Sequence, residues 1–267
     1  MGALVNDDDG AVVWASHPGA SYGGPAWSPK LQFRHLYEII KLMIEYARGI
    51  PADRIRFTLP PVIYNPYYDQ TLPFLLSILK FSNVRTELTQ AVSLDFSTDN
   101  VLDTFVNKTR TSIRQAQRYG LEFRILDNPS ADELDHFWDI LVENRAGLGV
   151  VPAHSREEIE KLHKLIPEYL MMAVAEKDGE WAAVIWNFIC NQCTVLEFYM
   201  AHILEHQHLK PVPFLTLNTM LWAKERGFKY LDFGISTIHG DPTWGLLRFK
   251  ENFASRHYLR QTWQIDL

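Results

Sequence analysis

The sequence contains few cysteines and no long apolar run. Only Cys190 and Cys193 occur among its 267 residues, so a disulfide framework is excluded. No apolar segment approaches the roughly eighteen residues that a membrane-spanning helix needs. The first ten residues lack the basic and apolar segments of a secretion signal. We therefore expect a cytoplasmic protein that does not cross a membrane.

The sequence also lacks an excess of positive charge. It has 26 Lys and Arg against 32 Asp and Glu, which gives a net charge of −6. A protein that binds nucleic acid through bulk charge should be basic, so any tRNA or cofactor phosphate must be bound by a local basic patch. The two cysteines form a C-x-x-C motif, but it lies in an expected hairpin turn and no second pair occurs. A redox or zinc role for this motif is therefore disfavoured.

Hydrophobic periodicity predicts a chain of alternating helices and strands. Apolar residues recur at helical spacing from residue 31 to residue 48, where Gly49 and Pro51 end the pattern. The other predicted helices are at 72–81, 101–119, 130–144, 155–167, 213–226 and 244–253. The predicted strands are at 12–15, 54–59, 84–96, 122–126, 169–176, 180–190, 193–202, 230–235 and 256–267.

The order helix, strand, helix, strand occurs twice, at residues 31–96 and at residues 213–267. With an offset of 171 positions, four of the twelve residues from Arg85 to Phe96 are identical to their counterparts. Chance would give about one identity at typical residue frequencies. The pattern predicts two related αβ modules.

Three motifs carry a resemblance to a known family. Residues 108–120 (KTRTSIRQAQRYG) are similar to the basic helix that opens the second domain of Fem-type aminoacyltransferases. Residues 230–236 (YLDFGIS) and 245–253 (GLLRFKENF) resemble the closing pattern DFG-x-S … GL-x-x-FK-x-x-F of that branch. Residues 16–24 (SHPGASYGG) resemble the glycine turn in the first domain of its bacterial members. The sequence therefore resembles the Fem-type branch of the GNAT acyltransferase superfamily.

This resemblance implies an α/β (α+β) fold with tandem GNAT-like mixed sheets that are flanked by helices. Residues 1–98 are expected to form a partial N-terminal GNAT-like domain, and residues 99–267 a complete C-terminal one. The first sheet is expected to be truncated, because only about thirty residues precede its first helix. A second subunit in a homodimer would cover the resulting edge strand.

An acyl transfer to an amine needs a base for the nucleophile and a group that stabilises the oxyanion. Glu197 lies in the apolar strand 193–202, where burial is expected to raise its pKa. Period-2 alternation places Tyr199 on the same face as Glu197. We predict a catalytic role for both residues, and the alternative for Glu197 is a carboxylate that only forms structural hydrogen bonds.

The residues around the end of strand 230–235 are further candidates. The resemblance implies that Lys250 lies near the reaction centre, where it would neutralise the oxyanion or a donor phosphate. Asp232, Ser236 and His239 lie at the end of the strand and in the loop after it, where ligands gather in open α/β sheets. Asp232 and Ser236 are predicted to be catalytic, and His239 to contact substrate.

The turn at residues 204–211 differs from that of GNAT enzymes that bind acetyl-CoA, because it contains no glycine. The first turn of the following helix, with Phe214, still offers free N–H groups to a phosphate. His206, His208 and Lys210 would add to this cofactor site. An alternative metal site of His202, His206 and His208 matches no known zinc pattern, so we expect no metal.

A basic stripe is the best candidate for binding a phosphate-bearing substrate. Arg110, Arg114 and Arg118 recur every four residues and line one helix face. A solvated helix surface explains the same spacing. In the first domain, His17 and Tyr22 flank the glycine turn and are predicted to face a ligand, although His17 would also suit a turn that it stabilises.

Three functions follow from these residues. The first is N-acyl transfer from a thioester donor, acyl-CoA or acetyl-CoA, to a small-molecule or peptide-like amine. The second is aminoacyl transfer from aminoacyl-tRNA to a cell-envelope or peptide precursor. The third is a non-catalytic member that binds a ligand or partner. The glycine-free turn weakens the first hypothesis, and the net charge of −6 weakens the second.

Overall fold

The computed structural model describes residues 2–126 and 128–267, which form two compact units. Unit 1 comprises the chain up to Thr89 together with Ile235–Thr243 and His257–Leu267. Unit 2 comprises Gln90–Gly234 and Trp244–Arg256. Each unit is a mixed sheet flanked by helices, which confirms the predicted fold class. None of the helices in the described part of the chain has the length and apolar character to span a bilayer.

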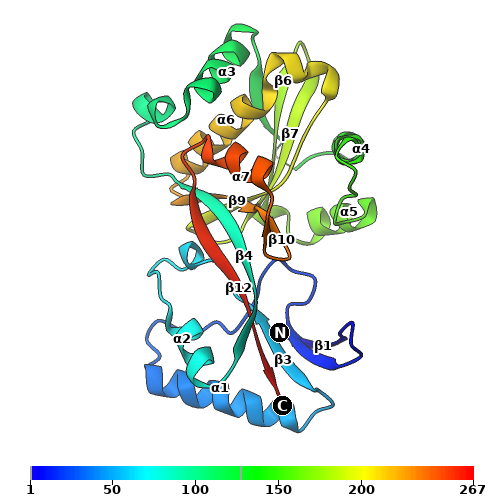
Figure 1. The fold of residues 1–267 in the computed structure, drawn as a ribbon. Helices are drawn as coiled ribbons and strands as arrows, with labels where there is room; N and C mark the ends of the chain where they lie inside the picture. Colours follow the sequence, from blue (N-terminus) through cyan, green and yellow to red (C-terminus); the bar gives the residue numbers. More distant parts are fainter. Residues whose placement is uncertain (1, 127) are drawn as a thin grey trace. The chain divides into compact units, whose positions relative to one another are not determined.

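The sheet of unit 1 has the strand order β1-β2-β3-β12-β4 (Figure 1). β1 and β2 form an antiparallel hairpin, β2 is parallel to β3, and β12 is antiparallel to β3. The elements of this unit are β1 (Gly2–Asn6), β2 (Val12–Ser16), α1 (Phe33–Arg48), β3 (Arg54–Thr58), η1 (Val62–Tyr64), α2 (Thr71–Ile78), the first part of β4 (Ser82–Ser93), β10 (Thr237–Ile238), β11 (Asp241–Pro242) and most of β12 (Arg256–Asp266).

One face of this sheet packs on α1 and α2. The buried residues of α1 are Leu36, Ile40, Ile44 and Ala47, whose spacing of three and four places them on one side of the helix. They share a core with Ile55 and with Phe57, whose ring stacks on that of Phe81 with centroids 5.7 Å apart.

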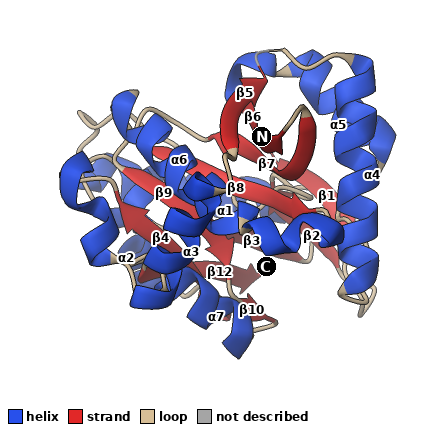
Figure 2. Cartoon of the chain, turned by 90° about the horizontal axis from the view of Figure 1, so that it is seen from above, coloured by secondary structure: helices blue, strands red, loops and turns tan. Residues whose placement is uncertain are grey.

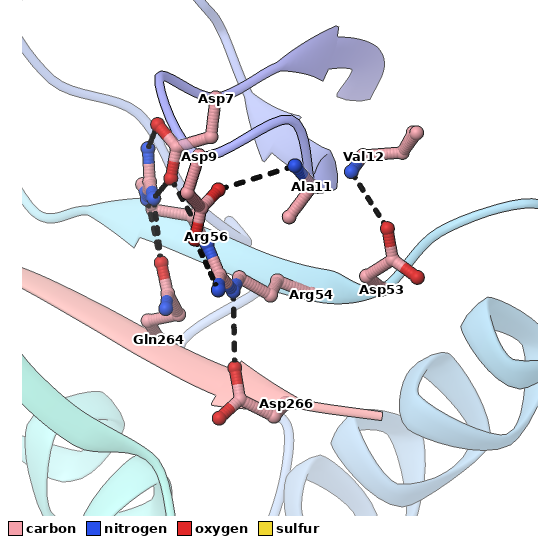
Figure 3. Close-up of polar contacts among 9 residues, drawn as sticks. All are labelled: Asp7, Asp9, Ala11, Val12, Asp53, Arg54, Arg56, Gln264 and Asp266. Carbon is pink, nitrogen blue, oxygen red and sulfur yellow. Dashed lines mark hydrogen bonds and ion pairs between the residues drawn. The ribbon is translucent and has the colours of Figure 1, made fainter.

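The other face of β3 carries two arginines that fasten the β1–β2 turn to the sheet (Figure 3). Arg54 donates to Asp9 (2.7 Å) and Asp266 (3.2 Å), and Arg56 donates to Asp7 (2.5 Å) and Gln264 (2.9 Å). The partners on β12 are those that the register places opposite, Asp266 to Arg54 and Gln264 to Arg56. Hydrogen bonding to Arg56 lowers the pKa of Asp7, so this carboxylate is charged at neutral pH and the ion pair is maintained.

The sheet of unit 2 has the strand order β4-β9-β8-β7-β6-β5, with α6 packed against β6, β7 and β8 (Figure 2). Its elements are the end of β4, η2 (Thr98–Thr104), α3 (Asn107–Arg118), β5 (Glu122–Leu126), α4 (Ala131–Gly147), α5 (Arg156–Leu165), η3 (Pro167–Tyr169), β6 (Leu170–Lys177), β7 (Glu180–Ile189), β8 (Thr194–His202), η4 (Leu204–Leu209), α6 (Pro211–Glu225), β9 (Tyr230–Ile235) and α7 (Trp244–Glu251).

This sheet has an apolar core on each face because its central strands are buried on both sides. On β7, Ala183 and Ile185 belong to the core of α3 and α6, whereas Val184 and Trp186 belong to the core of α4. Both α4 and α5 begin with a capping box, at Ser130 and Ser155, as the sequence signatures indicate.

Several features differ from the sequence-based predictions. β1 was not expected, and residues 101–119 form η2 and then α3, because Phe105 and Val106 are extended between them. α6 begins at Pro211, two residues before the predicted start. The domain boundary at residue 98 stays a prediction; of the two compact units, unit 1 includes His257–Leu267, in a strand that pairs with β3.

Candidate functional site

Glu197 and Tyr199 point to opposite faces of the sheet, which makes the prediction of a shared face wrong. Glu197 pairs with Asn187 and Tyr199 with the preceding Trp186, so Phe198 is an extra residue in β8. Such a β-bulge reverses the alternation of side chains beyond it. Accordingly, Val195 lies in the core of α6, whereas Tyr199 lies in the core of α4.

Glu197 also lies where two parallel strands stop pairing. β8 and β9 are paired at Thr194–Tyr230, Val195–Leu231 and Leu196–Asp232, and the paired register ends there. β8 continues to His202 without this partner. Glu197 is therefore the first residue of β8 beyond the ladder, at a fork between the strands.

Asp232 and Lys250 both form hydrogen bonds with the backbone of Gly234, at the end of β9. Gly234 donates its N–H to Asp232 Oδ1 at 2.8 Å, and its carbonyl oxygen accepts from Lys250 Nζ at 2.8 Å. The φ angle of Gly234 is +73°, a left-handed conformation that glycine adopts without a steric penalty. Lys250 and Asp232 are almost fully buried, with 4% and 2% exposure.

Burial and mutual charge change the pKa values of this cluster. Burial raises the pKa of Glu197 to about 8; the Lys250 ammonium opposes this rise and the Asp232 carboxylate adds to it. Burial lowers the pKa of Lys250 to about 8, against the attraction of Asp232 and Glu197. Glu197 Oε2 is buried without a protein hydrogen-bond partner. Glu197 and Lys250 therefore titrate near neutral pH within a buried cluster that also contains Asp232, and Glu197 Oε2 is left for a ligand or water.

Tyr199 lies in a different environment, on the side of α4. Its hydroxyl accepts the backbone N–H of His154 (3.1 Å) and lies 2.9 Å from His154 Nδ1. The Arg145 guanidinium is 5.9 Å from the centre of its ring. Burial raises the pKa of Tyr199, so this phenol stays protonated at neutral pH.

The start of α6 offers fewer phosphate donors than the sequence suggested. Pro211 and Pro213 occupy the first and third helical positions and have no N–H, so Val212 and Phe214 supply the donors of the first turn. The Phe214 side chain is buried in the core. Lys210 precedes the helix in a left-handed conformation and remains half-buried.

The histidines of η4 have separate partners. His206 Nε2 lies 3.6 Å from Glu180, and His208 Nδ1 lies 2.8 Å from the Glu205 carbonyl oxygen. His202 contacts Asn144. In the part of the chain that the structure describes, no three His, Cys, Asp or Glu side chains are grouped as metal ligands.

The predicted arginine stripe lies on the outer side of α3, whose buried side carries Thr109, Ile113 and Ala116. Arg114 and Arg118 are exposed. Arg110 forms an ion pair with Asp103 at 3.4 Å.

The remaining predicted site residues belong to unit 1. Ser236 is fully buried and its N–H donates to the Leu88 carbonyl oxygen at 2.8 Å. His239 is exposed in the turn between β10 and β11. His17 contacts Ser16 and packs against Gly23, where a Cβ would collide with its ring. The Tyr22 ring lies edge-on to Tyr64.

Sequence reasoning missed three polar residues near β8. Asn187 lies opposite Glu197 and is fully buried, and His154 and Arg145 contact Tyr199 and Met200. The asparagine in the apolar strand 180–190 was the one local signal. The contact of Arg145 depends on how α4 packs on β8, and that of His154 on how the segment between α4 and α5 folds back on this strand.

Comparison with known proteins agrees with this fold. A family model described as "Acetyltransferase (GNAT) domain" matches residues 104–251. A search of curated protein sequences gives no match. The structure of FemX has a TM-score of 0.76 and 13% identity, over 96% of this chain and 81% of FemX.

Two further structures share the fold. The C-terminal domain of a putative lysylphosphatidylglycerol synthetase from Agrobacterium fabrum has a TM-score of 0.64 and 15% identity, over 98% of this chain and 83% of that one. L-PGS from Bacillus licheniformis has a TM-score of 0.60 and 14% identity, with the same coverage. Since the family model spans more than half of the sequence, the chain belongs to the GNAT acetyltransferase family, with the fold of the Fem-like tandem GNAT proteins.

Proposed function

We propose that the protein is an N-acyltransferase that moves an acyl group from a thioester donor, acyl-CoA, to an amine. The observation that carries this proposal is the buried Glu197 at the end of the β8–β9 ladder. Its pKa is raised to about 8, and Lys250 and Asp232 act on it electrostatically. A base whose pKa lies near the working pH is efficient in proton transfer.

In this reaction the amine nitrogen attacks the carbonyl carbon of the thioester. A C–N bond forms, the C–S bond breaks, and Glu197 takes the proton that the nitrogen loses. Lys250 offsets the negative charge that develops on the carbonyl oxygen, and its lowered pKa lets the ammonium supply the proton to the departing thiolate. Asp232 accepts the N–H of Gly234, and the carbonyl oxygen of the same residue holds Lys250 in place.

A second candidate, aminoacyl transfer from aminoacyl-tRNA, is favoured by one observation at the start of α6. Pro211 and Pro213 remove two of the N–H groups that would bind the pyrophosphate of CoA. A tRNA donor does not present a pyrophosphate there. The exposed Arg114 and Arg118 on α3 would contact its backbone phosphates.

The test measures donor binding and turnover in parallel. Thermal unfolding is followed with CoA, acetyl-CoA and longer acyl-CoAs, where a ligand at a hundred times its Kd adds about 2.7 kcal/mol to the free energy of unfolding. Release of free CoA thiol in the presence of an amine panel measures turnover. We expect both signals, and we expect Glu197→Gln to lower kcat about 100-fold or more while acyl-CoA still binds.

Glu143→Gln, which changes an exposed glutamate of α4, is the matched control and should keep full activity. Deacylation of charged tRNA by the amine, without any CoA signal, would replace the first proposal by the second. Absence of both reactions would leave a non-catalytic binding protein.

A further inference from the structure

Arg145, near the end of α4, is a half-buried arginine without an acidic partner in the described part of the chain. Its Nη1 donates to Asn144 Oδ1 (2.9 Å) and to the Met200 carbonyl oxygen (3.2 Å), both of which are neutral acceptors. Five other arginines each have a carboxylate partner, namely Arg54, Arg56, Arg110, Arg124 and Arg156. A partly desolvated cation without a counterion is costly, so an anionic ligand would stabilise this site.

The other edge of the guanidinium is open. Nε and Nη2 of Arg145 donate to no described protein acceptor, and neither is among the described polar atoms that are buried without a partner. These two N–H groups are therefore accessible to solvent. They are the pair that binds a carboxylate through two parallel hydrogen bonds, and the bonds of Nη1 hold them in a fixed orientation.

Arg145 lies at the open side of β8. Ile203 donates its N–H to the Ala182 carbonyl oxygen, and hydrogen-bonded pairs alternate along an antiparallel ladder. The Met200–Ile185 pair is thus not hydrogen-bonded, and the Met200 carbonyl points away from β7, toward the side that β9 has left. Arg145 therefore binds the strand edge of the fork that Glu197 begins.

The walls of this site are aromatic and already ordered. The Tyr199 ring lies 5.9 Å from the guanidinium, and its hydroxyl is held by His154. The Phe198 ring is 4.7 Å from that of Tyr199 and 5.4 Å from that of His154. These contacts fix the surroundings of Arg145 before any ligand binds.

We propose that the amine acceptor carries a carboxylate and that the Nε–Nη2 edge of Arg145 binds it. This inference rests on the proposed acyl transfer at Glu197. Met200 is three positions after Glu197, at most about 10 Å along the strand, which leaves room for an amine and a carboxylate a few bonds apart. A singly charged group fits better than a phosphate because burial lowers the pKa of the neighbouring His202, which keeps that imidazole neutral.

The test uses α-, β- and γ-amino acids, each beside its primary amide and the matching aminoalkylphosphonate, with whichever donor supports turnover. In wild type the amino acid should have the lowest KM of each set. Arg145→Gln should raise that KM about 10- to 100-fold, as expected for loss of a charged hydrogen-bonded pair, with kcat within about 3-fold. The KM of the amide should not change. Arg145→Lys should restore part of the effect.

Arg156→Gln, which changes an arginine already paired with Asp135 and Glu160, is the matched control and should leave all KM values unchanged. Equal KM for amino acids and amides, or an equal rise for both in Arg145→Gln, would overturn the inference while leaving acyl transfer intact. A preference for the phosphonate would overturn the assignment of a carboxylate.

Direct binding separates this inference from the proposed function. If no donor is turned over, saturation-transfer NMR with β-alanine and its amide still applies to wild type and Arg145→Gln. Binding of β-alanine that is lost in Arg145→Gln would support the Arg145 site even without catalysis. Equal binding of β-alanine to both proteins, or binding to neither, would overturn it.

Discussion

At the scale of single residues, burial of Glu197, Asp232 and Lys250 lowers the stability of the fold and also sets the pKa values that the proposed reaction uses. Each of these side chains is at most 9% exposed, although charged groups prefer water. Part of this cost appears as the altered pKa values of Glu197 and Lys250. The same burial that destabilises the charged forms gives both groups a proton affinity suited to catalysis near neutral pH.

The pKa of Glu197 predicts how stability depends on pH. Between the ordinary pKa of 4.5 and the folded value of about 8, the native state binds more protons than the unfolded chain. The free energy of unfolding should therefore fall as pH rises through this window, by up to about 1.4 kcal/mol per pH unit. Urea unfolding of wild type and Glu197→Gln at pH 5, 6, 7 and 8 measures it, and the slope should be smaller in the variant.

Lys250 should change the free energy of unfolding with pH in the opposite direction. Its folded pKa of about 8 lies below the ordinary 10.5, so the cost of burying its charge is present below pH 8 and is relieved as pH rises further.

Glu143→Gln is the control for the experiment on Glu197→Gln, and its free energy of unfolding should have the wild-type dependence on pH. The same slope in Glu197→Gln would show that Glu197 is not the group that titrates.

At the scale of elements, β8 and β9 create the site by departing from regular pairing. The extra Phe198 turns Tyr199 to the side of α4 while Glu197 stays on the side of α6. The end of the β8–β9 ladder then leaves backbone groups of β8 for other partners, of which Arg145 is one. Two irregularities within a few residues thus place the candidate residues Glu197 and Tyr199 on opposite faces of one strand.

The end of β9 depends on Gly234, which suggests a paired substitution. Gly234→Ala should cost about 1–2 kcal/mol, because φ is +73° there, and should also shift the carbonyl oxygen that binds Lys250. Gly227→Ala should cost a similar amount, because Gly227 ends α6 with φ +84°. Chemical denaturation measures both costs, and turnover should fall in Gly234→Ala alone. Equal activity of the two variants would show that the backbone of Gly234 does not contribute to the site.

At the scale of the whole molecule, the two αβ repeats predicted from the sequence, at residues 31–96 and 213–267, do not correspond to the two compact units. The last strand of the second repeat, β12, lies between β3 and β4 in unit 1. The last residues of β4, which close the first repeat, belong to unit 2, where Leu94 donates its N–H to the Lys229 carbonyl oxygen. Each unit is therefore completed by a strand from the other repeat.

Because β12 pairs with β3, we predict that unit 1 needs this C-terminal strand in order to fold. A chain that ends at Ser255 leaves β3 without the partner that pairs Thr58, Phe57 and Arg56, and it removes Trp263 and Ile265 from the core of α1 and α2. Hydrogen exchange should show loss of protection in β3, with α4 still protected. Trp263→Ala, a milder change, should give the same pattern in part. Hydrogen-exchange protection of β3 at the wild-type level in the shortened chain would contradict this prediction.

The sequence predicted most elements because their signals are local. The Leu36, Ile40, Ala47 stripe, the capping boxes at Ser130 and Ser155, and the glycine that ends α6 act within a few residues. The buried glutamate was also local, since an acid in the apolar strand 193–202 has few polar neighbours. These features follow from periodicity and turn chemistry alone.

The tertiary structure decided which of these groups meet. The bulge at Phe198 depends on the register between β7 and β8, and a shift of one residue moves each later side chain to the other face. Lys250 meets the Gly234 carbonyl oxygen, and Arg145 meets that of Met200, over 16 and 55 residues of sequence. The sequence by itself determined the elements, the family resemblance and the candidates Glu197, Asp232 and Lys250. Only packing decided that Tyr199 faces away from Glu197 and that β12 completes unit 1, because contacts between distant segments have no signal in local periodicity.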